Sequence, residues 1–166
     1  MTVISTEKDT EALHFRLVAE FDAGVERVWQ IWADAGQLQR WWGPPSWPAT
    51  FETYEFHEGG RAAYYMTGPE GEKARGWWWI TAIEAPMRLT FVDGFADENG
   101  DPVPDMGETV ATVTLEDVGG RTRMTMTTAF QSIEQLEQMA EMGMDQGIRE
   151  ALGQVDVLLA EDAAAV

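Results

Sequence analysis

The stretch FDAGVERVWQIWADAGQLQRWWGPPSW, residues 21–47, decides the fold expected for this chain. Asp22 precedes a first run of apolar side chains at helical spacing, which comprises Val25, Val28, Trp29 and Trp32. Asp34 precedes a second, shorter run, and both aspartates are residue types that cap helix N-termini. The segment Gly43-Pro44-Pro45 ends the second run, because proline lacks a backbone donor and clashes with the preceding turn. The stretch therefore predicts two short consecutive helices.

Strand patterns stand on both sides of these predicted helices. Before them, residues 13–20 alternate apolar and polar side chains, which predicts one strand. After them, residues 47–128 read as antiparallel strands separated by turn signals at Gly59-Gly60, Gly68-Pro69-Glu70-Gly71, Ala85-Pro86, Asn99-Gly100 and Gly119-Gly120. Five turns divide this region into six strands that follow one another in a meander.

The last segment, residues 133–159, carries an apolar stripe with a period near 3.6 and predicts a long helix across the sheet. Glycines at positions 143, 147 and 153 would weaken this helix or allow a bend. The order strand, two helices, six strands and long helix predicts an α+β helix-grip fold, in which a curved antiparallel sheet wraps the terminal helix. Because a curved sheet cannot touch a straight helix everywhere, we expect an internal cavity between them.

Length and composition indicate a single domain. The chain has 166 residues and 45% hydrophobic residues, which suits one globular domain expected over residues 12–160. Residues 1–11 are polar and are expected to be a loose N-terminal segment, and residues 161–166 a C-terminal tail. No apolar run is long enough to span a membrane, and the N-terminus lacks the pattern of a secretory signal, so a cytoplasmic location is the expectation.

The charge of the chain limits its partners. Eleven basic and 29 acidic residues give a formal net charge of -18, which repels nucleic acid and anionic lipid surfaces. The acidity is read mainly as a solvated surface, with a docking face for a basic partner as the alternative. The absence of cysteine removes disulfides, thiolate nucleophiles and sulfur-bound metals.

Eight tryptophans provide the candidate ligand-binding surface, and clustered indoles beside glycine and proline suggest a cavity wall in preference to plain core. In the triplet Trp77-Trp78-Trp79, adjacent rings must point to opposite faces of a strand, so at least one should lie outside, at a partner surface or under a loop. Large and adaptable side chains on the sheet and the last helix complete the predicted cavity lining: Trp42, Phe56, Tyr64, Met66, Trp77, Trp79, Phe91, Met126, Met139 and Met144.

Signals for catalysis and for metal binding are weak, and no residue is assigned a catalytic role. There is no nucleophile elbow, and the candidates for general acid–base catalysis are His14, His57, Glu52, Glu55 and Tyr64, with His57 expected in solvent. Asp97, Asn99, Asp101 and Glu108 match part of a calcium loop, but the glycine and flanking helices that such a loop needs are missing. We interpret Asn99-Gly100 as a hairpin turn and expect no metal and no cofactor.

Several ordered motifs resemble the SRPBCC superfamily of START-like and birch-pollen-allergen-like domains, and within it bacterial homologues of the C-terminal domain of the Hsp90 ATPase activator. The motifs are Trp41-Trp42-Gly43-Pro44, Gly59-Gly60-Arg61 and the Pro86-x-Arg88-Leu89 signature, within a similarity covering residues 12–160. The resemblance implies the helix-grip fold and an internal hydrophobic cavity. It does not select a function, because this superfamily includes carriers, cyclases and chaperone activators.

Three functional hypotheses therefore remain open. The first is a binding protein for a small hydrophobic or aromatic ligand, lipid-like or polyketide-like, held in the cavity. The second is a chaperone cofactor that acts through its acidic surface, as the resemblance implies. The third is a polyketide cyclase-like enzyme. The sequence favours a non-enzymatic role and leaves monomer and homodimer open.

Overall fold

The computed structural model describes the backbone of residues 3–164 and the side chains of residues 5–105 and 107–161. It has four α-helices, one short 3-10 helix and eight strands in mixed order. The strands are β1 (Val3–Asp9), β2 (His14–Phe21), β3 (Ala49–Tyr54), β4 (Arg61–Thr67), β5 (Lys73–Glu84), β6 (Arg88–Ala96), β7 (Glu108–Val118) and β8 (Arg121–Ala129). The helices are α1 (Val25–Ala33), α2 (Ala35–Trp41), η1 (Pro104–Met106), α3 (Ile133–Glu141) and α4 (Met144–Ala164).

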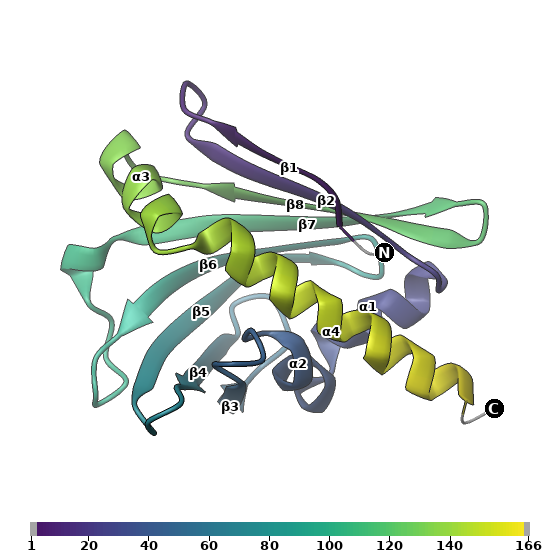
Figure 1. Cartoon of the computed structure of the whole chain (residues 1–166), viewed down its shortest axis with the longest axis horizontal. Coiled ribbons are helices and arrows are strands. Elements are labelled where there is room, and N and C mark those ends of the chain that lie inside the picture. The colour runs from purple at the N-terminus through teal and green to yellow at the C-terminus, as the bar shows by residue number, and fades with distance from the viewer. Residues whose placement is uncertain (1–2, 165–166) are drawn as a thin grey trace.

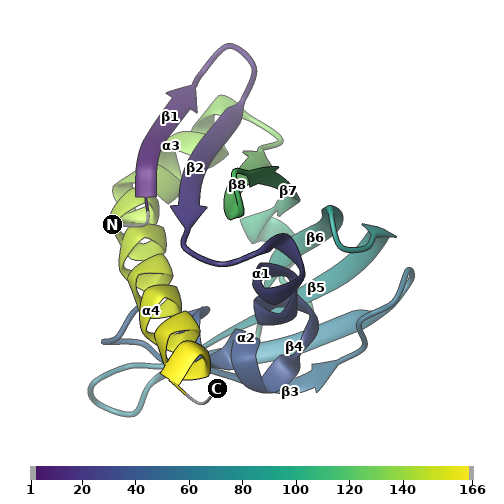
Figure 2. The ribbon, with the colours of Figure 1, turned by 90° about the vertical axis from the view of Figure 1, so that its right-hand side faces the viewer.

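All strands form one antiparallel sheet in the order β1-β2-β8-β7-β6-β5-β4-β3. The sheet is strongly curved, and α4 runs along its concave side (Figures 1 and 2). Helix α2 lies against β3 and α4, and α1 lies beside α2 and against β7 and β8. Each predicted turn from Gly59 to Gly120 lies between two strands. Four of the five turns contain a glycine with a positive φ angle, and the turn at Ala85-Pro86 contains a cis peptide bond instead. The predicted α+β helix-grip fold is confirmed.

The N-terminal segment differs from the prediction. Residues Val3–Asp9 form the edge strand β1, which pairs with β2, and are not a loose segment. The polar run STEKD lacks the apolar alternation from which a strand is predicted. An edge strand does not need an apolar face of its own, and polar side chains there prevent its free edge from pairing with other chains. The β1–β2 turn is closed by the Asp9 carboxylate, which accepts hydrogen bonds from the backbone N–H groups of Glu11 and Ala12.

The C-terminal segment also differs, because two helices replace the single predicted one. Helix α3 begins after Ser132, whose hydroxyl accepts a hydrogen bond from the backbone N–H of Gln135 at 3.1 Å. It ends at Glu141, and Gly143 follows with φ +87°, a left-handed conformation in which a side chain is strained. Of the three glycines that could allow a bend, Gly143 is the one at which the helix breaks.

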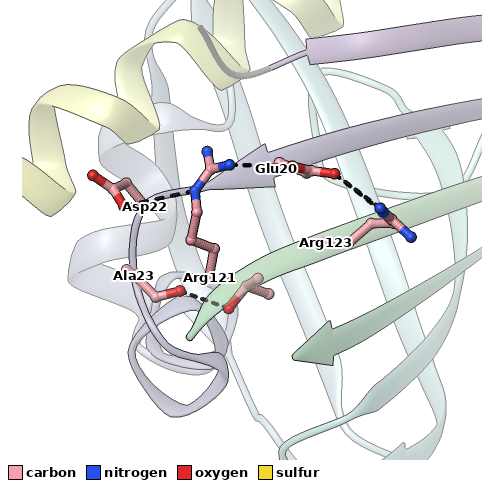
Figure 3. A network of polar contacts seen from close by, with 6 residues as sticks. Glu20, Asp22, Ala23, Arg121 and Arg123 are labelled. Carbon is pink, nitrogen blue, oxygen red and sulfur yellow. Dashed lines mark hydrogen bonds and ion pairs between the residues drawn. The ribbon is translucent and has the colours of Figure 1, made fainter. Parts of the chain in front are cut away.

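The two predicted caps near the short helices have different outcomes. Asp34 caps α2, because its carboxylate accepts a hydrogen bond from the backbone N–H of Gly36 at 3.0 Å. Asp22 does not cap α1, whose N-cap is Gly24. The Asp22 carboxylate instead faces Arg121, which also contacts Glu20, in the ion-pair network that ties β2 to β8 (Figure 3).

Tryptophans fill the core of the domain. Trp32, Trp41, Trp42 and Trp78 are buried and pack against one another, with ring centroids 4.8 Å apart for Trp32–Trp41 and for Trp42–Trp78. Phe91 stacks on Trp78 with centroids 4.0 Å apart. This cluster corrects the preference for tryptophans as a cavity wall, because these four indoles pack against one another as core residues.

The triplet on β5 divides between the two faces of the sheet, as predicted. Trp78 points inward and has no exposed surface, whereas Trp79 points outward and is 42% exposed. The guanidinium of Arg61 lies over the Trp79 ring. Trp77 lies on the outer face above Gly94, where a Cβ atom would clash with its ring, and its indole N–H donates to the carbonyl of Phe95 at 3.1 Å.

The acidic loop after β6 forms a hairpin-like turn. The Asp97 carboxylate accepts hydrogen bonds from the backbone N–H groups of Asn99 and Asp101, at 2.9 and 3.0 Å, and Gly100 has φ +86°. These bonds support the hairpin interpretation of Asn99-Gly100. Among the described residues, no helix combines the length and hydropathy needed to cross a membrane.

Candidate functional site

A cavity of about 200 Å³ lies between the concave face of the sheet and the joint between α3 and α4. The sheet contributes side chains from β2, β4, β6, β7 and β8, and the helices contribute three apolar side chains. The lining comprises Phe15, Leu17, Tyr64, Asp93, Gly94, Phe95, Gly107, Thr109, Met126, Thr128, Phe130, Met139, Met144 and Ile148. The cavity predicted between sheet and terminal helix is therefore present.

The break between α3 and α4 forms one side of this cavity. Met139 from α3 and Met144 from α4 line it on either side of Gly143, and Ile148 lies one helical turn further on. Met142, between the two methionines, is 59% exposed and points away. Because methionine side chains are unbranched and polarizable, this wall can adapt to ligands of different shape.

The polar end of the cavity is a carboxyl group on β6. Leu89 and Phe91 point to the concave face of β6, and Asp93 follows at the next inward position. The hydroxyl of Tyr64 donates a hydrogen bond to Asp93 Oδ1 at 3.2 Å. Tyr64 reaches across the sheet because its ring lies over Gly76, where a Cβ atom would meet the phenol at 2.5 Å.

Burial controls the protonation of this pair. Burial raises the pKa of Asp93 from its ordinary 3.8 to about 7, although the hydrogen bonds from Tyr64 and from the backbone of Gly94 favour the ionised form. Burial and the negative charge of Asp93 raise the pKa of Tyr64 well above its ordinary value. The indole N–H groups of Trp42 and Trp78 lower it in part, without reaching hydrogen-bond geometry. Tyr64 therefore stays a proton donor while Asp93 can change charge near neutral pH.

Thr109, Thr128 and Gln135 add further polar groups on or beside the cavity. Thr109 Oγ1 donates to the carbonyl oxygen of Asp93 at 3.4 Å. Beside the cavity, Gln135 is buried and donates through Nε2 to the carbonyl of Glu108, and it accepts from the backbone N–H of Gln131 at 2.7 Å. Across the side chains that the structure describes, no cluster of three metal-ligating groups occurs.

Four of the ten predicted lining residues lie on this cavity: Tyr64, Met126, Met139 and Met144. The other six are not among its lining residues. Trp42 and Phe91 belong to the buried aromatic cluster, and Trp77 and Trp79 lie on the outer face of the sheet. Phe56 packs against Trp29 of α1, and Met66 packs against the core.

Of the five acid–base candidates, one lies on the cavity and the other four lie outside it. Tyr64 faces the cavity, whereas His57, Glu52 and Glu55 are exposed outside it, as predicted for His57. His14 lies on the outer face of β2 at its pairing with Asp9.

Sequence reasoning did not select Asp93, although a signal was present. In RLTFVDGF the inward positions of the strand are Leu89, Phe91, Asp93 and Phe95, so a carboxylate falls where the alternation demands an apolar side chain. A charged residue at an inward position of a strand is a functional candidate, because its desolvation lowers the stability of the fold and a functional role is a reason to retain it.

Comparison with known proteins gives one family and many similar structures. The family model described as "Activator of Hsp90 ATPase homolog 1-like protein" matches residues 22–160. An NMR structure of a protein from Arthrobacter aurescens is 64% identical, with 96% of this chain and 93% of that chain covered and a TM-score of 0.92. A crystal structure of a protein from Mycobacterium smegmatis is 43% identical, with 95% and 96% covered and a TM-score of 0.88. No curated protein matches.

Proposed function

The chain belongs to the family of activator of Hsp90 ATPase homolog 1-like proteins, and from that premise we propose that it binds a small apolar or aromatic molecule. The site is the cavity between the sheet and the α3–α4 joint. The observation that carries the proposal is a largely apolar cavity in which three of the four polar side chains of the described lining, Asp93, Tyr64 and Thr109, lie together at one end. An apolar body with a small number of placed polar groups is the usual composition of a ligand pocket.

The cavity volume limits the size of this ligand. An apolar cavity of about 150 Å³ is enough to bind benzene, and this one measures about 200 Å³. Pockets for drug-sized ligands usually occupy about 300–1,000 Å³. The ligand is therefore a molecule with one ring or a short chain, and a whole lipid or polyketide would need the methionine wall to move.

Binding of ethylbenzene tests this proposal, and adjacent threonines on β8 provide matched variants. Thr128 lines the cavity, whereas Thr127 points to the other face of the sheet. We expect ethylbenzene to shift the methyl NMR signals of Met126, Met139 and Met144 in the wild type. The Thr128→Phe variant should weaken binding at least tenfold by filling the cavity, and Thr127→Phe should leave it within about twofold. Absence of ethylbenzene binding to the wild type, or equal binding to both variants, contradicts the proposal.

A second candidate is regulation of a chaperone ATPase, which the family description and the net charge of -18 favour. An acidic surface docks on basic partners through electrostatic attraction that salt screens. We expect the protein to raise the ATPase rate of a bacterial Hsp90 homologue, with an effect that falls at high salt and persists in Thr128→Phe. An ATPase rate that does not respond to saturating protein at low salt removes this candidate.

A further inference from the structure

We infer that the cavity selects ligands that combine a small apolar body with a protonated amine, and that the Asp93 carboxylate binds this amine. The inference rests on the proposed ligand-binding function and names the chemical class of the ligand. It follows from the hydrogen bonds at the polar end of the cavity and from the charges around it.

The described groups that contact Asp93 at the polar end of the cavity already use their protons. Tyr64 has a single hydroxyl proton, which it donates to Asp93 Oδ1. Thr109 directs its hydroxyl proton to the backbone oxygen of Asp93. The backbone N–H of Gly94 also supports the carboxylate. Since these protons are already used, the lone pairs of Asp93 remain as the binding group, and the ligand must bring the donor.

Among the described side chains, no cation balances the charge of Asp93. Within the described side chains, no lysine or arginine forms an ion pair with Asp93, and none lines the cavity. An ionised carboxylate that is buried without a cation is costly. An ammonium group supplies both the positive charge and several N–H donors, and charge-assisted hydrogen bonds of this kind are about twice as strong as neutral ones.

The field of the whole protein favours the same ligand class. A net charge of -18 concentrates small cations near the surface and repels carboxylates and phosphates. An anionic ligand would in addition meet Asp93 in a cavity whose described lining includes no basic side chain. Neutral alcohols can donate one hydrogen bond to Asp93 but leave its charge uncompensated.

The pH dependence of amine binding follows from the groups that face Asp93. Tyr64 on β4 is the other titratable lining residue, and it remains protonated because burial raises its pKa. The lining residues of β2, β7, β8, α3 and α4 are apolar side chains and threonines. Burial raises the pKa of Asp93 to about 7, so lowering the pH below that value neutralises the binding group. Amine affinity should fall about tenfold from pH 8 to pH 6.

The test uses three probes of similar size on the full chain: ethylbenzene, benzylamine and benzoate. At pH 8 we expect benzylamine to bind the wild type at least tenfold more tightly than it binds Asp93→Asn, while ethylbenzene binds both within about twofold. Benzoate should bind the wild type more weakly than either. For the wild type alone, the affinity for benzylamine should fall about tenfold from pH 8 to pH 6, while the affinity for ethylbenzene stays the same. This comparison tests the inference even if Asp93→Asn does not fold.

Two results overturn the inference. One is ethylbenzene binding with no preference for benzylamine over benzoate, which leaves the proposed function intact. The other is failure of both ethylbenzene and benzylamine to bind the wild type, which removes the proposed function as well.

Discussion

Replacing Trp78 by alanine is expected to lower the free energy of unfolding by about 3–5 kcal/mol, the range for large aromatic residues in well-packed cores. Trp78 has no exposed surface and stacks on Phe91, with ring centroids 4.0 Å apart. Its ring also lies 4.8 Å from Trp42 and 5.5 Å from Phe51 between centroids. Since these partners come from β6, β3 and the end of α2, they cannot all close over the vacated space.

The neighbouring Trp79 provides the matched control. It has the same side chain on the same strand but is 42% exposed, with Arg61 over its ring. Urea unfolding of the two variants at one pH should show a loss of about 1 kcal/mol or less for Trp79→Ala. Comparable losses for the two substitutions would mean that the outward face of β5 is packed against something in solution, in conflict with the division of the triplet between the two faces.

Trp78 and Trp79 also show which features of the fold can be predicted from the sequence and which cannot. Period-two alternation predicts that neighbours in a strand point to opposite faces, and this holds for Trp78 and Trp79. It cannot predict which face α1 and α2 cover, because that depends on contacts between segments far apart in the chain. For this reason, indoles assigned to the cavity wall lie in the core or outside.

Local signals were sufficient where the cause of a structure is local. The turn at Asn99-Gly100 and the cap at Asp34 depend on backbone geometry within a few residues, and both were predicted. Strand β1 was missed because its order comes from pairing with β2 and not from its own polar sequence. The cavity itself was predicted from the mismatch of sheet and helix, but its position depends on the break at Gly143.

Replacing Asp93 by asparagine is expected to stabilise the protein above neutral pH. The ordinary pKa of 3.8 describes the unfolded chain, and burial raises it to about 7 in the folded state. Between these values the folded state holds more protons than the unfolded state, so the free energy of unfolding of the wild type falls as pH rises and levels off above pH 7. Asparagine has the same shape and cannot ionise, so the free energy of unfolding of the variant does not fall in this way as pH rises.

The stability difference between Asp93→Asn and the wild type should therefore grow by about 2–3 kcal/mol from pH 5 to pH 8, in favour of the variant. Urea unfolding at several pH values measures it, with Asp101→Asn as the control because Asp101 is exposed in the turn after β6. The control difference should stay constant within about 0.5 kcal/mol. A constant difference for Asp93→Asn as well would mean that the carboxyl is solvated in the folded state.

The same measurement connects stability to ligand binding. If Asp93 is kept at a cost in stability because it binds an amine, saturating benzylamine should stabilise the wild type most at pH 8, where the uncompensated carboxylate is fully formed. The wild type should then lose less stability between pH 5 and pH 8 than it does without benzylamine. Asp93→Asn has no carboxylate to neutralise, so benzylamine should leave the slope of its stability against pH unchanged. An equal change of slope in both proteins would place the amine elsewhere on the acidic surface.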